Sequence, residues 1–248
     1  LGQNSAKAFN VLFQNENGER ELVWATSWGV STRLIGALIM THSDDNGLVL
    51  PPNLAPYQVV IIPIYKNSIE QKSVEKVADK LMKELRAHNI RVKFDNRDKL
   101  KPGFKFNEYE LKGVPLRIAI GPNDINQGTV EIARRDNLSK ETVKQKEVLS
   151  FIKSRLNEIQ NTLFLKAKKF REENITFVDN FKDFKKTLDN KGGFISAHWD
   201  GTNSTEEAIK RETKATIRCI PLDTKEENGV CIYSGNPSNK RVLFAKAY

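Results

Sequence analysis

A continuous apolar run at residues 59–64, Val-Val-Ile-Ile-Pro-Ile, limits the possible folds more than any other feature of this chain. An unbroken apolar run is typical of a strand that is covered on both faces, whereas a half-exposed strand alternates apolar and polar residues. A helical apolar stripe follows it, made of Val74, Val77, Ala78, Leu81 and Leu85. Further strands are predicted at residues 90–94, 115–120 and 128–134, with a short helix at 102–111. This order predicts an α/β domain with a largely parallel sheet.

The segment before this domain is predicted to form strand, turn, strand and helix over residues 1–50. The turn falls at residues 15–18, and Phe9, Val11 and Phe13 alternate as in a half-buried strand. Prolines at positions 51, 52 and 56 then indicate a domain boundary.

A long basic helix is predicted over residues 140–173. Its apolar seam could indicate either a coiled coil or a face packed on its own domain, and the gap at positions 166–167 favours the second. The seam comprises Leu149, Ile152, Leu156, Ile159, Leu163 and Phe170.

The remainder, residues 192–248, is predicted to be a small α+β module. We expect strands at 194–199, 216–222 and 241–247, and a helix at 204–212 that is capped by Asn203 or Ser204. The chain is thus expected to have three parts, residues 1–54, 55–140 and 141–248.

The charge balance favours an anionic partner. The 248 residues include 40 Lys and Arg against 31 Asp and Glu, a net charge of +9, and nucleic acid is the usual partner of such a surface. Two cysteines, Cys219 and Cys231, cannot form a disulfide framework, and no signal peptide or membrane-length apolar segment is present. We therefore expect a cytoplasmic protein without a membrane partner. The missing initiator Met suggests that the chain was cut from a longer one.

Arg33 lies where a stretch of aromatic and small residues, expected to end a strand, meets an apolar helix, in the sequence WATSWGVSTRLIGA at residues 24–37. Its guanidinium is permanently charged and donates hydrogen bonds in a planar fork, which suits a nucleotide phosphate. Taken alone, such an arginine could equally be a surface side chain at a helix end.

These residues, with THSDDNGLVLPP at 41–52, resemble motif 3 of class II aminoacyl-tRNA synthetases, in the form found in prolyl-tRNA synthetases of the eukaryotic and archaeal-like type. The resemblance implies that residues 1–54 end an antiparallel-sheet catalytic domain. It also implies that Arg33 binds ATP near the α-phosphate, and that Ser27, Trp28 and Gly29 wall the proline pocket. Without the surrounding motif, Trp28 would be interpreted as an ordinary core aromatic.

Charged and aromatic residues alternate in DNRD at 95–98 and KPGFKFNEYELKGVPLR at 101–117. Single-stranded RNA is recognised by such mixtures, because splayed bases stack on rings and are read at their edges. The segment resembles the anticodon-binding domain of the same synthetases, an α/β domain with a mixed sheet. The anticodon-binding residues that we predict are Asp95, Arg97, Lys105, Phe106, Glu108, Glu110, Lys112 and Arg117.

Proline anticodons carry two successive guanines. Glu108 and Glu110 are candidate acceptors for guanine N1 and N2, and the four basic residues are candidate donors to O6 and N7. We expect about half of these charges to act indirectly. The sequence Arg134-Arg135-Asp136 also matches the family, with no expected role beyond structure or backbone contact.

The last part departs from the family pattern, which often has four zinc-binding cysteines here. Asp200 follows Trp199 where the resemblance implies a first cysteine, and Thr205 lies near the second position. Cys231 is retained, but Ser234 replaces its partner. One thiolate with scattered oxygens is a poor structural zinc site, so we predict no zinc and a domain held by packing alone. Cys219 is expected in the core.

The resemblance spans the whole chain and implies a proline–tRNA ligase that uses ATP with Mg²⁺, proline and proline tRNA, and that forms a homodimer through its catalytic domain. Tyr248 is implied to lie near the active site. No candidate for class II motifs 1 or 2 is present, so this polypeptide alone is expected to be inactive.

Two alternatives have different functions. A non-catalytic, synthetase-derived RNA-binding module would not need Arg33 in its motif. A small-molecule enzyme with a doubly wound sheet would need a glycine-rich phosphate loop after residues 59–64, which the sequence lacks.

Overall fold

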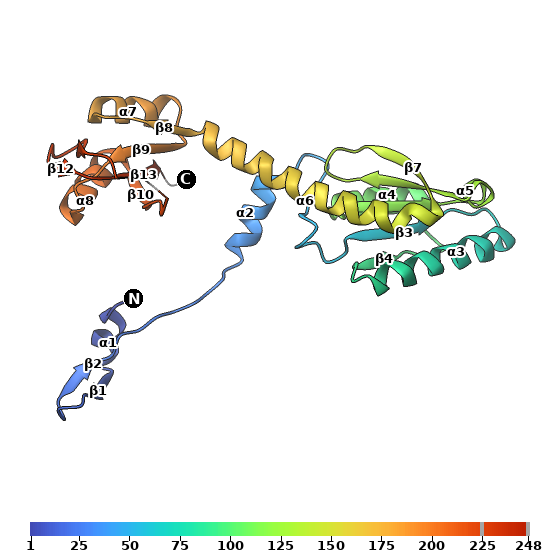
Figure 1. The fold of residues 1–248 in the computed structure, drawn as a ribbon, viewed down its shortest axis with the longest axis horizontal. Coiled ribbons are helices and arrows are strands. Elements are labelled where there is room, and N and C mark those ends of the chain that lie inside the picture. Colours follow the sequence, from blue (N-terminus) through green and yellow to red (C-terminus); the bar gives the residue numbers. More distant parts are fainter. Residues whose placement is uncertain (224–225, 247–248) are drawn as a thin grey trace. The chain divides into compact units, whose positions relative to one another are not determined.

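The computed structural model describes residues 1–223 and 226–246, which divide into two compact units. The first unit comprises residues 1–50 and 54–145, and the second comprises residues 51–53 and the chain from residue 146 onward (Figure 1). The units meet in sequence slightly after the predicted position 140/141, because residues 140–144 belong to the sheet of the first unit.

The first unit is built on a five-stranded sheet in the order β4-β3-β5-β6-β7. Its strands are β3 (Val59–Pro63), β4 (Val92–Phe94), β5 (Leu116–Ile120), β6 (Thr129–Arg134) and β7 (Lys140–Lys144). Strand β3 pairs in parallel with β4 and β5, whereas β6 is antiparallel to both of its neighbours. The sheet is therefore mixed, which confirms the mixed sheet that the family resemblance implies; the parallel pairing expected from the order of elements is confined to β4, β3 and β5. The loop between β6 and β7 is too short for the crossover that parallel strands require.

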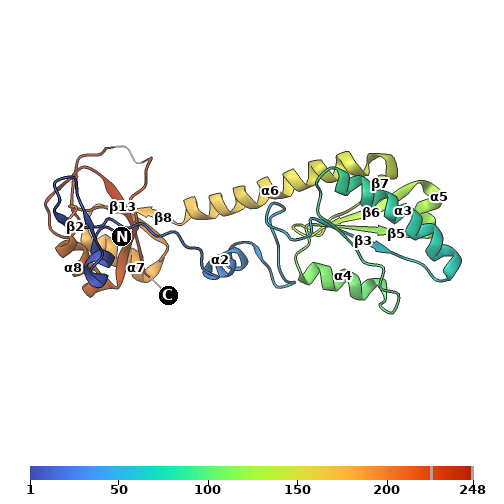
Figure 2. The ribbon, with the colours of Figure 1, turned by 90° about the horizontal axis from the view of Figure 1, so that it is seen from below.

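Helices cover both faces of β3, whose five residues are all buried. Helix α3 (Ser68–Ala87) packs against β3 and β4, and it begins where the Asn67 side chain accepts hydrogen bonds from two backbone N–H groups. Helix α4 (Pro102–Leu111) has the predicted bounds and begins with a proline at its first turn. Tyr109 of α4 packs with Val60 and Ile62, so α4 covers the opposite face of the sheet from α3 (Figure 2).

The α-helix begins at Val148, so the prediction of a helix from residue 140 was wrong. Residues 140–144 form β7, because Val143 is buried and the two ends of the strand are charged and exposed. A 3₁₀ turn, η1 (Gln145–Glu147), leads to α6 (Val148–Glu173). The predicted seam of α6 is buried from Ile152 to Leu163, whereas Phe170 is 69% exposed.

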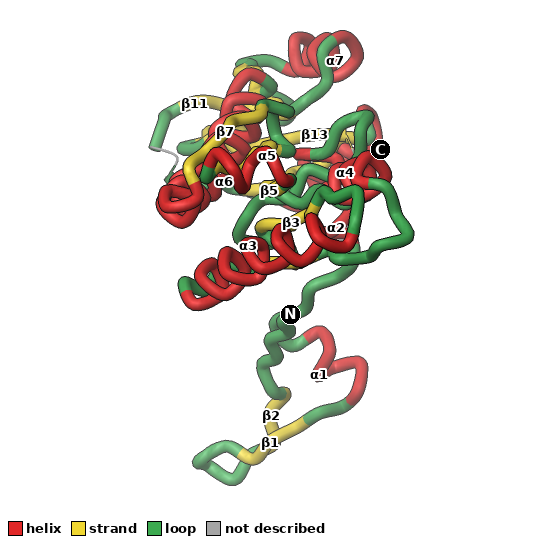
Figure 3. The backbone as a smooth tube through the Cα atoms, turned by 90° about the vertical axis from the view of Figure 1, so that its right-hand side faces the viewer, coloured by secondary structure: helices red, strands yellow, loops and turns green. Residues whose placement is uncertain are grey.

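The N-terminal part contains α1 (Asn4–Phe9), the hairpin of β1 (Leu12–Gln14) and β2 (Arg20–Leu22), and α2 (Arg33–His42) (Figure 3). Phe9 ends a helix and is 79% exposed, so its assignment to a half-buried strand was wrong. Among the described residues, the hairpin has no third strand to pair with. The apolar side chains of the hairpin therefore do not form part of the core of a larger sheet.

The second unit adds a four-stranded sheet in the order β10-β13-β9-β8 to helix α6. Phe184 of α7 and Phe244 of β13 meet edge to face in its core, with ring centres 5.2 Å apart. The helices and strands of this unit after α6 are β8 (Ile175–Phe177), α7 (Phe181–Asn190), β9 (Phe194–His198), α8 (Asn203–Thr213), β10 (Ala215–Cys219), β11 (Gly229–Val230), β12 (Pro237–Ser238) and β13 (Arg241–Lys246). The first unit also contains a short helix, α5 (Pro122–Gln127).

Two local predictions in this unit were wrong. Helix α8 is capped by Thr202, whose side chain accepts from the Thr205 backbone N–H, and not by Asn203 or Ser204. Cys219 is exposed and not in the core, because it ends the edge strand β10 after a register shift against β13. Cys231 is buried.

Candidate functional site

Arg33 is the first residue of α2 and is exposed. The preceding residues 23–30 form neither helix nor strand, so the predicted strand leading to Arg33 ends early, at Leu22 of β2. Ser27, Trp28 and Gly29 lie in this extended segment, and the Trp28 side chain is 94% exposed. An arginine at the N-terminus of a helix adds its charge to the positive end of the helix dipole, a combination that attracts anions.

Asp95 organises one group of the predicted anticodon residues from a buried position directly after β4. Its carboxylate accepts from Arg97 Nε at 2.9 Å and Nη2 at 2.6 Å, and Lys105 Nζ donates to its backbone oxygen at 3.1 Å. Burial by itself raises the pKa of Asp95, but the hydrogen bonds from Arg97 outweigh it and lower the pKa to about 2. Both Asp95 and Lys105 are inaccessible, with side chains 1% and 3% exposed.

Glu108 extends this group to the surface of α4. Its carboxylate binds Arg97 Nη2 and Lys112 Nζ, each at 2.6 Å, and hydrogen bonds from Lys112 and Arg97 lower the pKa of Glu108. The side chains of Arg97 and Lys112 are 45% and 58% exposed. The structure thus joins five of the predicted residues into one polar cluster: Asp95, Arg97, Lys105, Glu108 and Lys112.

The other three predicted residues, Phe106, Glu110 and Arg117, line a pocket of about 380 Å³ on the same unit. The guanidinium carbon of Arg117, on β5, lies 3.6 Å from the ring centre of Phe106. Burial lowers the pKa of Arg117, and Glu131 of β6 contacts its Nη2 at 3.3 Å. The Nε atom of Arg117 is buried and has no hydrogen-bond partner among the described residues. The pocket therefore combines an aromatic surface, a carboxylate and an unused donor.

Sequence reasoning missed Glu131, because only the pairing of β5 with β6 brings it near Arg117. It also gave Arg135, which lines the same pocket, no role beyond structure or backbone contact. The guanidinium of Arg135 binds the carboxylate of Asp44, far away in sequence, at 2.8 and 2.5 Å. This hydrogen bond lowers the pKa of Asp44. No spacing rule in the sequence connects residues 44 and 135.

In the second unit, Asp200 occupies the centre of a polar cluster where zinc cysteines were considered. Its carboxylate accepts from the hydroxyls of Ser234 at 2.7 Å and Thr205 at 2.9 Å. Thr202 donates both its N–H at 3.1 Å and its hydroxyl at 2.9 Å, and Asn236 donates its amide at 3.3 Å. We call these five residues the Asp200 cluster. Burial by itself raises the pKa of Asp200, but these hydrogen bonds, with that of Ser234 the largest contribution, hold it well below its usual range.

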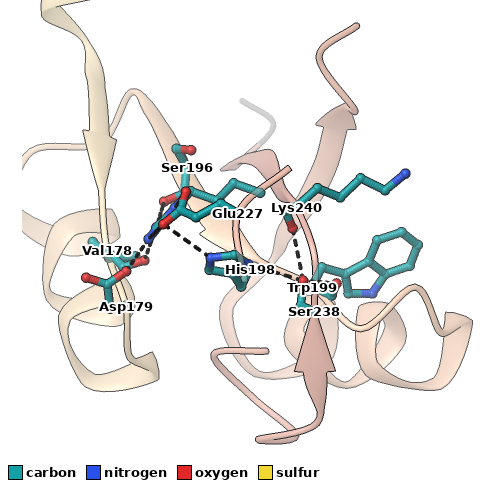
Figure 4. A network of polar contacts seen from close by, with 9 residues as sticks. Val178, Asp179, Ser196, His198, Trp199, Glu227, Ser238 and Lys240 are labelled. Atoms are coloured by element: carbon teal, nitrogen blue, oxygen red, sulfur yellow. Dashed lines mark hydrogen bonds and ion pairs between the residues drawn. The ribbon is translucent and has the colours of Figure 1, made fainter. Parts of the chain in front are cut away.

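A second polar network lies at one end of the two inner strands, β13 and β9, of the same sheet (Figure 4). Arg241 of β13 donates to the carboxylate of Glu227 at 2.9 and 3.0 Å, to Asp179, and to the backbone oxygen of Val178 at 3.0 Å. His198 lies beside Glu227, with its Nε2 3.6 Å from the carboxylate. The other ring nitrogen of the buried His198, Nδ1, lies 3.2 Å from the hydroxyl oxygen of Ser238, so both ring nitrogens have partners within the protein.

Replacing Asp200 with asparagine should destabilise β9 and α8 by about 1–2 kcal/mol at neutral pH, because charge-assisted hydrogen bonds are lost. The depressed pKa means that this stabilisation is present at neutral pH and is lost only as the pH falls through the folded-state pKa, so the two proteins should converge in strong acid. Hydrogen exchange in residues 194–213 measures the difference. A chelator should leave both proteins unchanged, and metal analysis should find no stoichiometric zinc. Bound zinc, or an unaltered exchange pattern in the variant, would contradict this account.

Residues 1–223 and 226–246 contain no group of three or more His, Cys, Asp or Glu side chains that could hold a metal ion. No helix among them has both the length and the apolar character needed to cross a bilayer. Tyr248, for which a place near the active site was predicted, lies outside the described residues.

Two family models match parts of this chain. A family model described as "Anticodon binding domain" matches residues 58–155, and one described as "Prolyl-tRNA synthetase, C-terminal" matches residues 181–248. The pocket and the Asp95 residues lie in the first match, and the Asp200 cluster lies in the second.

Curated relatives align with all of the chain. Proteins named proline–tRNA ligase are 64% identical in Christiangramia forsetii, 61% in Flavobacterium johnsoniae and 57% in Porphyromonas gingivalis. The alignments cover 100% of this chain and 50% of each relative, so the chain spans about half the length of the relatives it matches. With the two family models, this similarity shows that the chain belongs to the prolyl-tRNA synthetase family, as a C-terminal part of such a protein.

Proposed function

We propose that the whole protein of which this chain is a part is a proline–tRNA ligase. In the first step the proline carboxylate attacks the α-phosphate of ATP, accompanied by Mg²⁺, and pyrophosphate leaves. In the second step the prolyl group moves to a terminal ribose hydroxyl of proline tRNA, and AMP leaves. The observation that carries the proposal is the Arg117–Phe106 pocket within a segment that matches an anticodon-binding domain.

The pocket has the properties that a guanine site requires. Phe106 and the guanidinium of Arg117 offer flat surfaces for stacking, which is how proteins hold unpaired bases. The guanidinium of Arg117 can donate to guanine O6 or N7, and the carboxylate of Glu110 can accept from N1 and N2.

The polar cluster around Asp95 divides into inner and outer residues. Asp95 and Lys105 are buried, and we propose that they hold Arg97 in place without touching RNA. Arg97, Glu108 and Lys112 form the accessible edge, where a second base or the phosphate backbone could bind.

For the adenylation step we propose that Arg33 binds the α-phosphate of ATP and stabilises the charge that spreads over it during transfer. Trp28, beside Ser27 and Gly29, would enclose the compact ring of proline, and Tyr248 would approach the same site. The exposure of Arg33 and Trp28 in this chain is consistent with surfaces that face a ligand. We further propose that the enzyme is a cytoplasmic homodimer, paired through its catalytic domain.

The proposal predicts that this chain distinguishes tRNAs by their anticodons. At fixed salt, its affinity for proline tRNA should exceed its affinity for the same tRNA with both anticodon guanines replaced by at least about tenfold. Filter binding or fluorescence anisotropy measures both affinities. Equal affinities would mean that the positive surface binds RNA without reading it, and would contradict the assignment of the pocket.

A further inference from the structure

The segment that follows the Arg33 helix is attached to the end of the proposed anticodon helix. Helix α2 ends at His42, and Ser43 continues it with a backbone hydrogen bond to Ile39 at 3.0 Å. The backbone N–H of Leu48 then donates to the carbonyl of Leu111, the last residue of α4, at 3.0 Å. Leu50 donates to the carbonyl of Gly113 at 3.4 Å. We call residues 44–50 the linking segment.

Two glycines make this contact possible. A Cβ on Gly47 would lie 2.6 Å from the Cα of Leu111, and a Cβ on Gly113 would lie 2.6 Å from the carbonyl oxygen of Leu48. Both glycines also have positive φ angles, +130° and +69°, that disfavour other residues. The backbone of the linking segment is thus packed directly on the backbone at the end of α4.

Arg135 joins the same two elements through its side chain. Its two terminal nitrogens bind Asp44, the first residue of the linking segment, and its Nε donates to the backbone oxygen of Glu110 in α4 at 2.9 Å. The guanidinium side chain is only 2% exposed, whereas that of Asp44 is 42% exposed. A planar fork with three fixed contacts holds its partners at a defined angle as well as a defined distance.

We propose that Arg135 is a positioning residue that couples occupancy of the anticodon pocket to the orientation of α2, and so to Arg33. The inference rests on the proposed function. Arg135 lines the pocket, holds α4 at Glu110 and holds Asp44 two residues after the end of α2. Helix α2 then spans about 15 Å to Arg33 as one rigid element. A base that shifts Glu110 or Arg135 therefore acts on the helix that begins at the ATP-binding arginine.

The test compares aminoacylation of two tRNAs by the whole enzyme. The discrimination ratio is kcat/KM for proline tRNA divided by kcat/KM for the tRNA with both anticodon guanines replaced. Asp44→Asn keeps the shape of the side chain, removes its charge and lies outside the pocket. We expect it to lower the ratio about tenfold by slowing the cognate tRNA alone. Proline-dependent pyrophosphate exchange without tRNA, and the equilibrium affinity for proline tRNA, should stay near the wild-type values.

A second variant and a control make the result specific. Arg135→Lys keeps the charge but loses the fork, and its effect on the ratio should not add to that of Asp44→Asn, because both remove one interaction. Glu227→Gln is the matched control: Glu227 is a half-exposed carboxylate that accepts from Arg241 with both oxygens, at 2.9 and 3.0 Å, in the second unit and outside the pocket. It should leave the discrimination ratio unchanged.

The outcomes separate this inference from the function on which it rests. If Asp44→Asn keeps the wild-type ratio, or slows both tRNAs by the same factor, the contact is only structural and the coupling is wrong. If the wild-type enzyme exchanges pyrophosphate but does not discriminate between the tRNAs, the anticodon pocket and the coupling both fail. If it catalyses no exchange with proline, the proposed function itself is overturned.

Discussion

Replacing Arg33 with alanine in the whole enzyme should slow proline-dependent ATP–pyrophosphate exchange by about 100- to 1,000-fold, as loss of one charge-stabilising group in a transition state typically does. Arg33 begins α2 and has no ion-pair partner among the described residues, so its charge is available to a phosphate. The variant should fold normally, because the side chain removed is exposed and forms no hydrogen bond or ion pair among the described residues.

Two further variants define what Arg33 contributes. Arg33→Lys keeps the charge but cannot bind a phosphate with two parallel hydrogen bonds, so it should recover only part of the exchange rate. Arg211→Ala removes a basic residue from the last turn of α8 in the second unit and should have no effect on exchange. Near-normal exchange by Arg33→Ala would remove this arginine from the ATP site and weaken the motif 3 interpretation.

Replacing Arg117 with alanine should weaken binding of proline tRNA by about 1–3 kcal/mol, which is about 5- to 150-fold, while pyrophosphate exchange is retained. The substitution removes both the buried donor and the surface stacked on Phe106. The loss should be much smaller for the tRNA without anticodon guanines, because a base-reading contact matters only where the base is present. Equilibrium binding of the two tRNAs at one salt concentration measures both effects.

An exposed lysine outside the pocket serves as the control for Arg117. Lys169 of α6 has a side chain that is 77% exposed, and Lys169→Ala should change the affinities for both tRNAs equally or not at all. If Arg117→Ala also weakens the two tRNAs equally, Arg117 contributes only general positive charge. If it changes neither affinity, the pocket does not bind the anticodon.

The sequence alone was sufficient for features that depend on near neighbours in the chain. The unbroken apolar run at 59–64 predicted the buried strand β3, and Pro102 with the following residues predicted α4 with its observed bounds. The resemblance to prolyl-tRNA synthetases rested on short motifs, and the comparisons confirmed it. The same local reasoning failed at residues 140–144. This charged segment with β-branched residues forms a strand because it pairs with β6, and that pairing is not visible in the local sequence.

Only the tertiary structure decided which of the charged residues are accessible and which face one another. In the sequence, Lys105 and Arg117 are both basic residues of the same motif. In the structure, Lys105 is buried beside Asp95, whereas Arg117 lines a pocket and its Nε has no hydrogen-bond partner among the described residues. Asp200 accepts a hydrogen bond from Ser234 because the fold brings these two distant residues together. Asp44 reaches Arg135 because Gly47 and Gly113 allow the backbone of the linking segment to pack closely on the end of α4. Periodicity reports on residues two to four positions apart, whereas strand register and close packing determine contacts between distant residues, and neither is encoded in spacing along the chain.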